Sequence, residues 1–307
     1  NKDVVIKMIR KDIRENIPGM LNNLNSIIKF LGILPYFKSV HLYEIFEENK
    51  ELLIEQTDFV KEVSNIKKMW NNYKNNDEYI IPTVYSDFTD INKDMIVMDY
   101  IDGKTLYDIN DDQEKNTNDA DAYAFLLTKF GIKNILFNRL FHADLHPGNI
   151  FFVKTPQNIC KLGIIDFGIM GELTKDEQSD YYDFLTTLFK DDVNYTKVVD
   201  MLLKIYIEPQ ERIQNLKVKD KVKIETEIIK VIKLAIEDSG NLGTQELLNI
   251  NKILINYKLK LARKFCKVLL AAAISESVTM KLGCSKDGFS ANKDVIKNLF
   301  PTHLLEY

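Results

Sequence analysis

Long hydrophobic runs, an excess of basic charge and a cysteine framework are all missing from this sequence. The longest apolar run covers residues 268–274, far short of the ~20 residues that a membrane-spanning helix needs, so we expect a buried helix there. The formal net charge of −4 leaves no basic footprint, so nucleic acid is not expected as a partner. The three cysteines, Cys160, Cys266 and Cys284, are scattered, which predicts reduced thiols rather than a zinc or disulfide framework. No signal peptide is visible.

The periodicity of the chain predicts a mixture of strands and helices. A β-branched segment at 4–8 predicts a short strand, and apolar residues at helical spacing predict helices over 11–37 and 42–73. Residues 81–100 resemble a hairpin, with strands at 83–88 and 95–100. Beyond Gly103 we expect mainly helices, with an acidic surface loop over 108–121 and a helix over 122–139. With 307 residues, one two-lobed domain or two small domains are both compatible with the length.

The densest cluster of reactive side chains is His142-Ala143-Asp144-Leu145-His146-Pro147-Gly148-Asn149, followed 17 residues later by Asp166-Phe167-Gly168. Phosphoryl transfer needs a carboxylate beside the attacking hydroxyl, and an amide and a second carboxylate that hold Mg²⁺ on the phosphates. Asp144 and Asn149 fit the catalytic-loop spacing H-x-D-x-x-x-x-N, and Asp166 fits the metal-binding D-F-G. The combination, in this order, predicts a kinase-like site.

The segments around these motifs predict a hairpin. Ile150–Val153 is apolar and β-prone, residues 154–158 have turn chemistry, and residues 159–165 form a second apolar run. Such a hairpin would bring Asn149 and Asp166 to the same end. Amide and carboxylate oxygens suit Mg²⁺, so we expect both residues to bind one magnesium ion.

The eight residues from His142 to Asn149 resemble the H-A-D-x-H-P-G-N signature of the UbiB family of atypical kinases, also called ADCK or aarF-domain kinases. Ordinary protein kinases carry His-Arg-Asp and aminoglycoside phosphotransferases usually carry His-Gly-Asp at this place. The His-Pro-Gly insert therefore distinguishes the UbiB family from both groups. The resemblance implies an α+β, protein-kinase-like two-lobed fold, with an N-lobe over residues 1–100 and a helical C-lobe over 101–307.

The resemblance extends upstream and assigns further roles. The segment Val4–Lys7 resembles the strand that carries the lysine for the ATP phosphates, and Glu62 matches the helix glutamate that pairs with this lysine. The separation of 55 positions between Lys7 and Glu62 matches the helical insertion that is peculiar to the family. Residues Met98, Asp99 and Tyr100 resemble the hinge whose backbone holds adenine. ATP and Mg²⁺ are the implied cofactors.

Two features depart from the family pattern. The family's K-x-G-Q motif and Ala-rich nucleotide loop should precede the lysine strand, and neither lies in the printed sequence. Gln56 stands where the family has an acidic residue, two positions before Asp58. A fragment, a divergent copy and an inactive copy therefore remain open as interpretations.

The segment after Asp-Phe-Gly bears on the substrate. Five residues separate Gly168 from Thr174, which starts a capping box with Glu177. The long activation segment and Ala-Pro-Glu anchor of protein kinases, which dock peptide substrates, are missing. This favours a small or lipid-like acceptor, or ATP hydrolysis without a stable acceptor.

The predicted function is an atypical kinase-like ATP-dependent phosphotransferase or ATPase with Asp144 and Lys7 as catalytic residues. The resemblance implies a role in ubiquinone or prenyl-lipid metabolism, contacts with lipid-biosynthesis enzymes, and peripheral association with a mitochondrial, plastid or bacterial membrane. Two alternatives remain: a nucleotide-binding pseudokinase that serves as a scaffold, and a small-molecule kinase of the choline or aminoglycoside type.

The histidines of the motif have a structural and a metal-binding interpretation. We expect His142 to hydrogen-bond the backbone of the catalytic loop and His146 to cap or line it. Two histidines with Asp144 nearby would also suit a transition metal, which the kinase-like context makes the weaker hypothesis.

Overall fold

The computed structural model describes residues 2–31, 50, 54, 56–111, 117–239 and 244–300. Its chain forms two compact units. Unit 1 comprises Asn1–Asp102 together with Gly163–Met170, and unit 2 comprises Gly103–Leu162 together with Gly171–Tyr307. The predicted boundary between the lobes falls after residue 100. The return of Gly163–Met170 to the first unit was not anticipated from the sequence.

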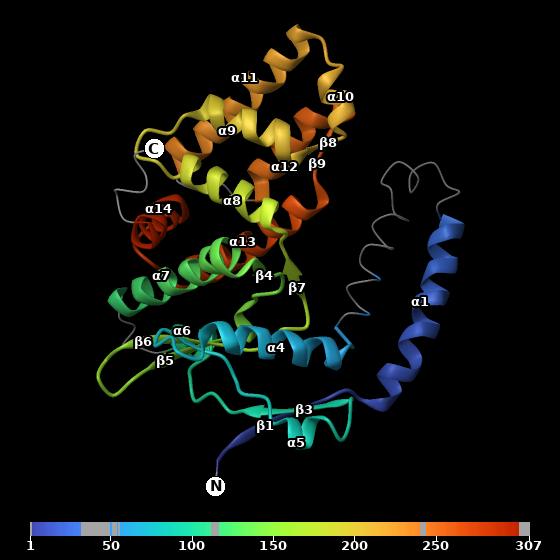
Figure 1. The fold of residues 1–307 in the computed structure, drawn as a ribbon, viewed down its shortest axis with the longest axis vertical. Helices are drawn as coiled ribbons and strands as arrows, with labels where there is room; N and C mark the ends of the chain where they lie inside the picture. The colour runs from blue at the N-terminus through green and yellow to red at the C-terminus, as the bar shows by residue number, and fades with distance from the viewer. Residues whose placement is uncertain are drawn as a thin grey trace. The chain divides into compact units, whose positions relative to one another are not determined.

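Unit 1 is built on a two-stranded antiparallel ladder. Strand β1 (Val4–Met8) pairs with β3 (Met95–Asp99), with Val4 opposite Asp99 and Met8 opposite Met95. The predicted strand at 4–8 is thus confirmed. Helix α1 (Lys11–Leu31) follows β1 directly (Figure 1), and the rest of the helix predicted to residue 37 lies outside the described residues.

Helix α4 (Phe59–Tyr73) is the central helix of unit 1. It begins at the N-cap Asp58, whose carboxylate accepts a 3.0 Å hydrogen bond from the Lys61 N–H and so satisfies one of the free donors of the first turn. Its buried face repeats at helical spacing and consists of Phe59, Glu62, Asn65, Ile66, Met69 and Tyr73. Residues 56 and 57 form a turn, so the prediction of one helix through to Tyr73 is wrong at this point. The part over 42–49 lies outside the described residues.

The hairpin predicted over 81–100 is also wrong in its first strand. Val84 makes an isolated bridge with Met98, and Ser86–Thr89 forms the short helix α5. Strand β3 instead takes β1 as its ladder partner, a choice set by a contact about ninety residues away in the chain, which local alternation does not encode. Strand β2 (Tyr79–Ile80) precedes this segment.

The first half of unit 2 carries the predicted catalytic loop. Helix α6 (Leu106–Asp111) is followed by α7 (Thr117–Lys133), which continues as a π-helical turn over Asn134–Asn138. The prediction of an acidic loop over 108–121 is therefore wrong for residues 108–111 and 117–121, which are helical. Residues 112–116 lie outside the described residues. The acidic side chains of this segment instead belong to helices. Asp119, for example, lies in the first turn of α7, where a negative charge interacts favourably with the helix dipole.

Four short strands surround the loop, of which β5 and β6 were predicted. The segments are β4 (Leu140–His142), a 3-10 turn (Pro147–Asn149), β5 (Ile150–Lys154), β6 (Cys160–Ile164) and β7 (Met170–Glu172). Strands β5 and β6 are neighbours in one sheet, and the Thr155 N–H donates to the Ile159 oxygen across their turn. The predicted hairpin is confirmed.

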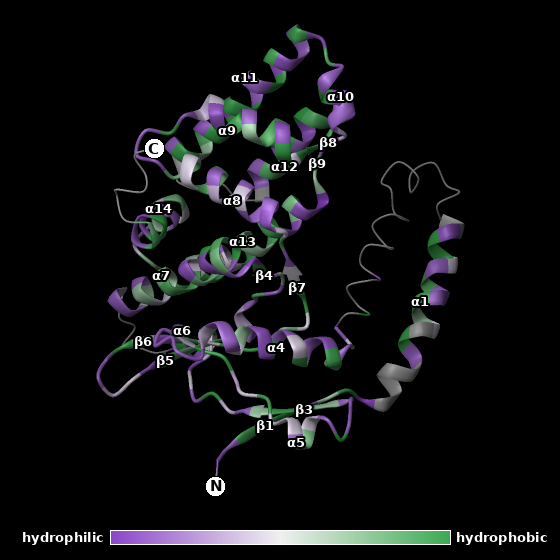
Figure 2. Ribbon diagram, in the orientation of Figure 1, coloured by the Kyte–Doolittle hydropathy of each residue, from purple (hydrophilic) through white to green (hydrophobic). Residues whose placement is uncertain are grey.

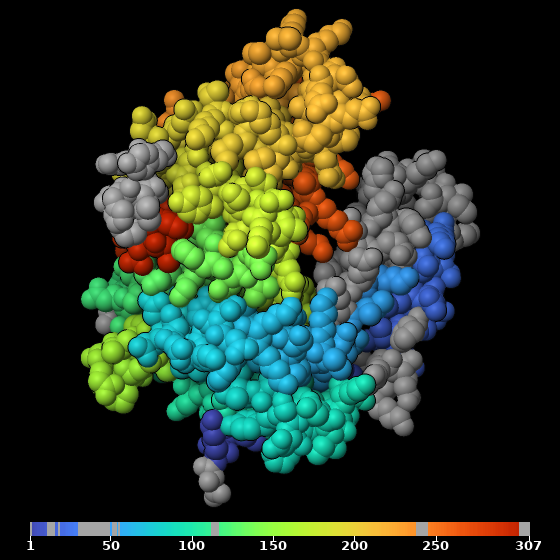
Figure 3. All heavy atoms as spheres, viewed as in Figure 1, coloured from blue at the N-terminus to red at the C-terminus, as the bar shows by residue number. Residues whose placement is uncertain are grey.

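The rest of unit 2 is a run of helices with one small strand pair. Helix α8 starts with the predicted capping box, because Thr174 and Glu177 bond each other's backbone N–H groups. Figure 3 shows α9 to α12 in yellow and orange as one continuous body. The elements are α8 (Lys175–Leu188), α9 (Tyr195–Met201), a π-turn (Leu202–Tyr206), β8 (Ile207–Glu208), α10 (Gln210–Gln214), α11 (Val218–Leu234), a π-turn (Ala235–Ser239), α12 (Thr244–Ile255), β9 (Lys260–Leu261), α13 (Arg263–Leu282) and α14 (Gly288–Leu299).

The core of unit 2 joins these helices through apolar faces. The rings of Tyr206 and Phe265 stack with centroids 4.1 Å apart, and Phe184 meets Tyr206 edge-on at 5.4 Å. Figure 2 shows apolar and polar residues alternating along α7 and α13, as expected for helices with one buried face. Helix α13 ends at Gly283, whose φ of 71° suits glycine. Within the described residues, no helix combines the length and the hydropathy that crossing a membrane would take.

Candidate active site

Lys7, Glu62 and Asp166 meet in unit 1. The Lys7 ammonium donates to both oxygens of Glu62, at 2.7 and 2.9 Å, and to Asp166 Oδ2 at 3.0 Å. Lys7 comes from β1, Glu62 from the first turn of α4, and Asp166 from the segment after β6. The expected pairing of Lys7 with Glu62 is present across 55 residues of sequence.

Burial shapes the electrostatics of this cluster. The Glu62 side chain is 1 % exposed, and burial raises the pKa of its carboxyl, while the Lys7 ammonium acts in the opposite direction. The Lys7 Nζ also lies 5.3 Å from the centre of the Phe59 ring, within range of a cation–π attraction. Asp166 is more open, with a side chain 41 % exposed. The cluster therefore presents one carboxylate to solvent and keeps the other inside.

The backbone of Asp166 is held in an uncommon conformation. Its φ is 60°, in the left-handed region that few residues other than glycine, asparagine and aspartate adopt readily. The Gly168 N–H donates to Asp166 Oδ1 at 3.3 Å, and the Phe167 side chain is fully buried. This geometry turns the Asp166 carboxylate toward Lys7 while Phe167 anchors the segment.

Asn65 is a positioning residue that the sequence prediction did not assign. Its Nδ2 donates a 2.8 Å hydrogen bond to the Phe167 oxygen, and the residue is 7 % exposed. The available signal was its spacing, because Asn65 lies three residues after Glu62 and hence on the same face of α4. An amide on a buried face must find a partner.

The predicted hinge residues are already engaged in unit 1. The Asp99 carboxylate accepts from the Tyr85 hydroxyl at 2.5 Å and from the Thr83 N–H at 3.1 Å. The Asp99 N–H donates to the Thr83 oxygen, and the Tyr100 N–H donates to the Asp3 oxygen at 3.4 Å. Met98 lies in the ladder opposite Val5. An adenine at this backbone would have to replace the long Tyr100–Asp3 bond.

The catalytic-loop residues are organised by local hydrogen bonds in unit 2. His142 Nδ1 accepts from the Asp144 N–H at 3.2 Å, as expected for a loop-holding histidine, and His142 is buried. His146 caps the 3-10 turn, since its Nδ1 accepts from the Gly148 N–H at 3.0 Å. Asn149 Nδ2 donates to the Asp144 oxygen at 2.9 Å. This last bond orients the Asn149 amide and closes the loop around Asp144.

The structure thus brings the predicted residues together in two groups. Lys7, Glu62 and Asp166 are in contact within unit 1, while Asp144 and Asn149 are in contact within unit 2. The joint binding of one ion by Asn149 and Asp166 stays a prediction.

The available ligands fit magnesium better than a transition metal. Because Asn149 donates through Nδ2, its amide oxygen is the atom it can offer to a cation, and Asp166 offers a partly exposed carboxylate. Both are oxygen donors, the type that Mg²⁺ prefers. In the described ranges, no three His, Cys, Asp or Glu side chains gather in an arrangement that could hold a metal ion.

A strand lysine paired with a helix glutamate, an adjoining Asp-Phe-Gly and a closed His-Ala-Asp loop define a protein-kinase-like protein of the α+β class. The model of the ABC1 atypical kinase-like domain family matches residues 1–201, and the chain belongs to this family. The resemblance to the UbiB and ADCK kinases is thereby confirmed.

One solved structure supports the fold. The complex of Rv3197 with erythromycin from Mycobacterium tuberculosis is similar with a TM-score of 0.62 and 17 % identity, covering 98 % of this chain and 72 % of that one. A Rio2 kinase complex with ADP/Mg²⁺ and phosphoaspartate from Chaetomium thermophilum matches with a TM-score of 0.28 and 16 % identity, covering 68 % and 57 % of the two chains.

Proposed function

We propose that this chain is an ATP-dependent phosphotransferase or ATPase. The observation that carries the proposal is the contact of one ammonium, Lys7 Nζ, with both Glu62 and Asp166. A lysine held in this way by a buried glutamate is placed to contact the phosphates of a nucleotide, and the adjacent aspartate is placed to take a metal ion. The adenine would hydrogen-bond the backbone of Met98, Asp99 and Tyr100.

The catalytic step is assigned to the loop in unit 2. Asp144 would orient or deprotonate the attacking hydroxyl or water, and its backbone is held by His142 and Asn149. Asn149 and Asp166 would hold Mg²⁺, which when bound offsets the negative charge of the phosphates. The Lys7 ammonium would bind the negatively charged α- and β-phosphates.

The acceptor is proposed to be small or lipid-like. Strand β7 starts at Met170, two residues after Gly168, and helix α8 starts at Lys175. The chain thus passes from the Asp-Phe-Gly segment into regular structure without room for the peptide-docking platform of protein kinases. Family membership supports a role in ubiquinone or prenyl-lipid metabolism, with lipid-biosynthesis enzymes as partners and a membrane surface as the location.

A thermal-shift titration with ATP and ADP, with and without Mg²⁺, tests the nucleotide site. A ligand at about 100 times its dissociation constant adds roughly 2.7 kcal/mol of stability, an easily measured shift. We expect a Mg²⁺-dependent shift in the wild type that is lost in Asp166→Ala and retained in the control Asp77→Ala, which changes an exposed aspartate of unit 1. No shift in the wild type would refute the assignment.

A nucleotide-binding scaffold without turnover is the second candidate. It is favoured by Gln56, which stands where the family has an acidic residue. ATP turnover separates the two candidates. The enzyme should hydrolyse or transfer phosphate, and Asp144→Asn should abolish turnover while keeping the Mg²⁺-dependent thermal shift. A wild type that binds ATP with Mg²⁺ but does not turn it over would support the scaffold.

A further inference from the structure

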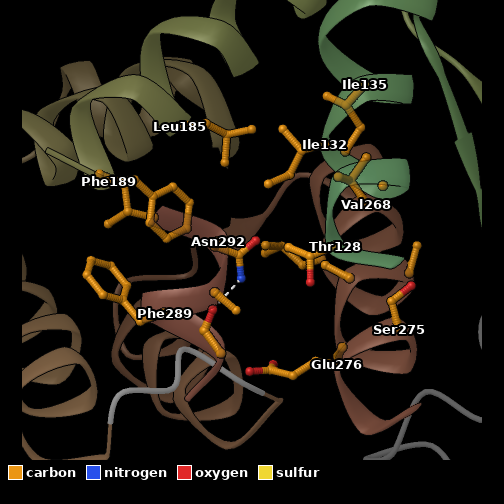
Figure 4. A pocket seen from close by; sticks show the side chains of 18 of the residues that line it. Thr128, Ile132, Ile135, Leu185, Phe189, Val268, Ser275, Glu276, Phe289 and Asn292 are labelled. Carbon is orange, nitrogen blue, oxygen red and sulfur yellow. Dashed lines mark hydrogen bonds between the residues drawn. The ribbon is translucent and has the colours of Figure 1, made fainter. Parts of the chain in front are cut away.

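A cavity of about 260 Å³ lies among the helices of unit 2. Its walls come mainly from α7, α8, α13 and α14 (Figure 4), and every residue that lines it belongs to unit 2. The apolar side chains that form most of the wall include Ile132, Ile135, Leu185, Phe189, Val268 and Phe289. Binding sites for small molecules combine such a lining with a few polar groups.

A few polar side chains stand among the apolar ones. Figure 4 shows Thr128 of α7 and Asn292 of α14 near the middle of the view, and Ser275 and Glu276 of α13 further toward its edge. The Asn292 amide donates to the Gly288 oxygen at 2.7 Å and is therefore engaged in its own helix. Glu276 is an acidic residue of the cavity lining and takes no part in the kinase-like site.

The Glu276 carboxylate is packed tightly against the start of α14. A methyl group added to Gly288 would collide with Glu276 Oε1, so glycine at this position gives the carboxylate its space. Burial raises the pKa of Glu276, and the nearby acids Glu246 and Asp287 act in the same direction. A cation beside a buried carboxyl with acidic neighbours favours its ionised form.

The other charges that line the cavity are already compensated. Asp121 accepts from the Ser285 N–H at 2.6 Å and from the Ser285 hydroxyl at 2.7 Å. Asp294 forms an ion pair with Lys286, the one lysine or arginine among the described lining residues. With Asp121, Glu276 and Asp294 against this single lysine, the charged lining is acidic.

We propose that this cavity binds a small apolar amine, with its hydrocarbon part between α7, α13 and α14 and its ammonium group on Glu276. The volume exceeds the roughly 150 Å³ of a cavity that holds benzene, so a medium alkyl chain or a substituted ring fits. A carboxylate of the same length would face Glu276 with like charge. The same cavity is lined by Phe141, His142 and Leu145, which flank Asp144.

Isothermal titration calorimetry on the full chain tests the proposal with octylamine, octanol and octanoate as probes. These ligands share the alkyl chain and differ in the head group. We expect octylamine to bind about tenfold more tightly than octanol, because a hydrogen bond to a charged partner is stronger than one between neutral groups. Octanoate should bind most weakly, and burial of the chain should give a negative heat-capacity change.

Two variants separate the head group from the apolar wall. Glu276→Gln keeps the shape and removes the charge, so octylamine affinity should fall about tenfold to that of octanol. Gly131→Leu should weaken octylamine and octanol alike, because a Cβ at Gly131 has no atom within 4 Å and the added chain would occupy the cavity. Melting temperatures establish that each variant is folded.

The controls use the same substitutions elsewhere. Glu227→Gln changes a partly exposed glutamate of α11 that pairs with Lys223. Gly19→Leu changes a glycine of α1 that also has open space beyond its Cα. Both should bind the probes as the wild type does. Absence of binding by all three probes would overturn the proposal. So would octanoate binding as tightly as octylamine, or an octylamine preference that survives in Glu276→Gln.

Discussion

Asn65 Nδ2 donates a 2.8 Å hydrogen bond to the oxygen of Phe167, which lies 102 residues further along the chain. One helical turn earlier, Glu62 binds Lys7. Helix α4 therefore holds the strand lysine with one side chain and the Asp-Phe-Gly backbone with the next. The position of Asp166 in unit 1 depends on both contacts.

Replacing Asn65 by alanine should loosen this arrangement. The Phe167 oxygen would lose this hydrogen bond, and the net loss of one intramolecular hydrogen bond costs about 0.5–1.5 kcal/mol. Denaturant unfolding should show a loss of this size in Asn65→Ala. Asn71→Ala, an exposed change on the same helix, serves as the control and should stay within about 0.5 kcal/mol of the wild type. Similar losses in the two variants would contradict the role of Asn65.

The Lys7–Glu62 pair should show energetic coupling. Lys7→Met leaves Glu62 buried beside no ammonium, so it should destabilise the protein, and Glu62→Gln in the same chain should relieve part of the loss. A double-mutant cycle should give a coupling of about 1–3 kcal/mol. The partly exposed pair Lys221–Glu225, at 3.9 Å, should give about 0.5 kcal/mol or less. Equal coupling in both pairs would show that the burial of Glu62 has no energetic consequence.

The Asp99 carboxyl predicts a dependence of stability on pH. Its burial raises the pKa, but the hydrogen bonds from Lys2, Tyr85 and Thr83 outweigh this and lower it from 3.8 to about 2. A carboxyl with a depressed pKa stabilises the fold above its ordinary pKa, and this contribution is lost as the pH falls through the lower value.

Asp99→Asn should therefore be less stable than the wild type at neutral pH. The gap in the free energy of unfolding should narrow as the pH falls from 3.8 toward about 2. Asp102→Asn, which removes an exposed carboxylate nearby in the chain, serves as the matched control for the loss of one charge. A constant gap for Asp99→Asn would mean that its hydrogen bonds do not favour the ionised form.

The same substitution at two glycines of unit 2 should have opposite effects. A methyl group at Gly171 would overlap the buried Phe141 ring, whereas one at Gly131 has open space. Gly171→Ala should cost about 1–3 kcal/mol through overpacking. Gly131→Ala should stabilise helix α7 by up to about 1 kcal/mol, because alanine favours the helix over glycine. Thermal or denaturant melting measures both, and changes of the same sign would contradict the packing described.

The features that short-range patterns encode could be predicted from the sequence. The strand at Val4–Met8, the hairpin after Asn149 and the capping box at Thr174 depend on neighbours in the chain. The pairing of Lys7 with Glu62 was foreseen from the family resemblance, because no local rule links residues 55 positions apart.

The remaining features depend on contacts that form only in the folded chain. Strand β3 pairs with β1 rather than with the segment before it, so the alternation around Thr83 was misleading. The engagement of Asp99 by Tyr85 and Thr83 follows from that pairing. Asn65 needed its partner Phe167, whose position no spacing in α4 reveals.

The return of Gly163–Met170 to unit 1 has a consequence for biosynthesis. Because unit 1 is closed by residues that follow Gly103–Leu162, a ribosome must complete this first segment of unit 2 before Asp166 can reach Lys7, 159 residues away. Contacts of such long range form late and slowly. A nascent chain that ends near Asp102 would carry Lys7 and Glu62 without their third partner, so the cluster of three residues could form only after Asp166 has been synthesised.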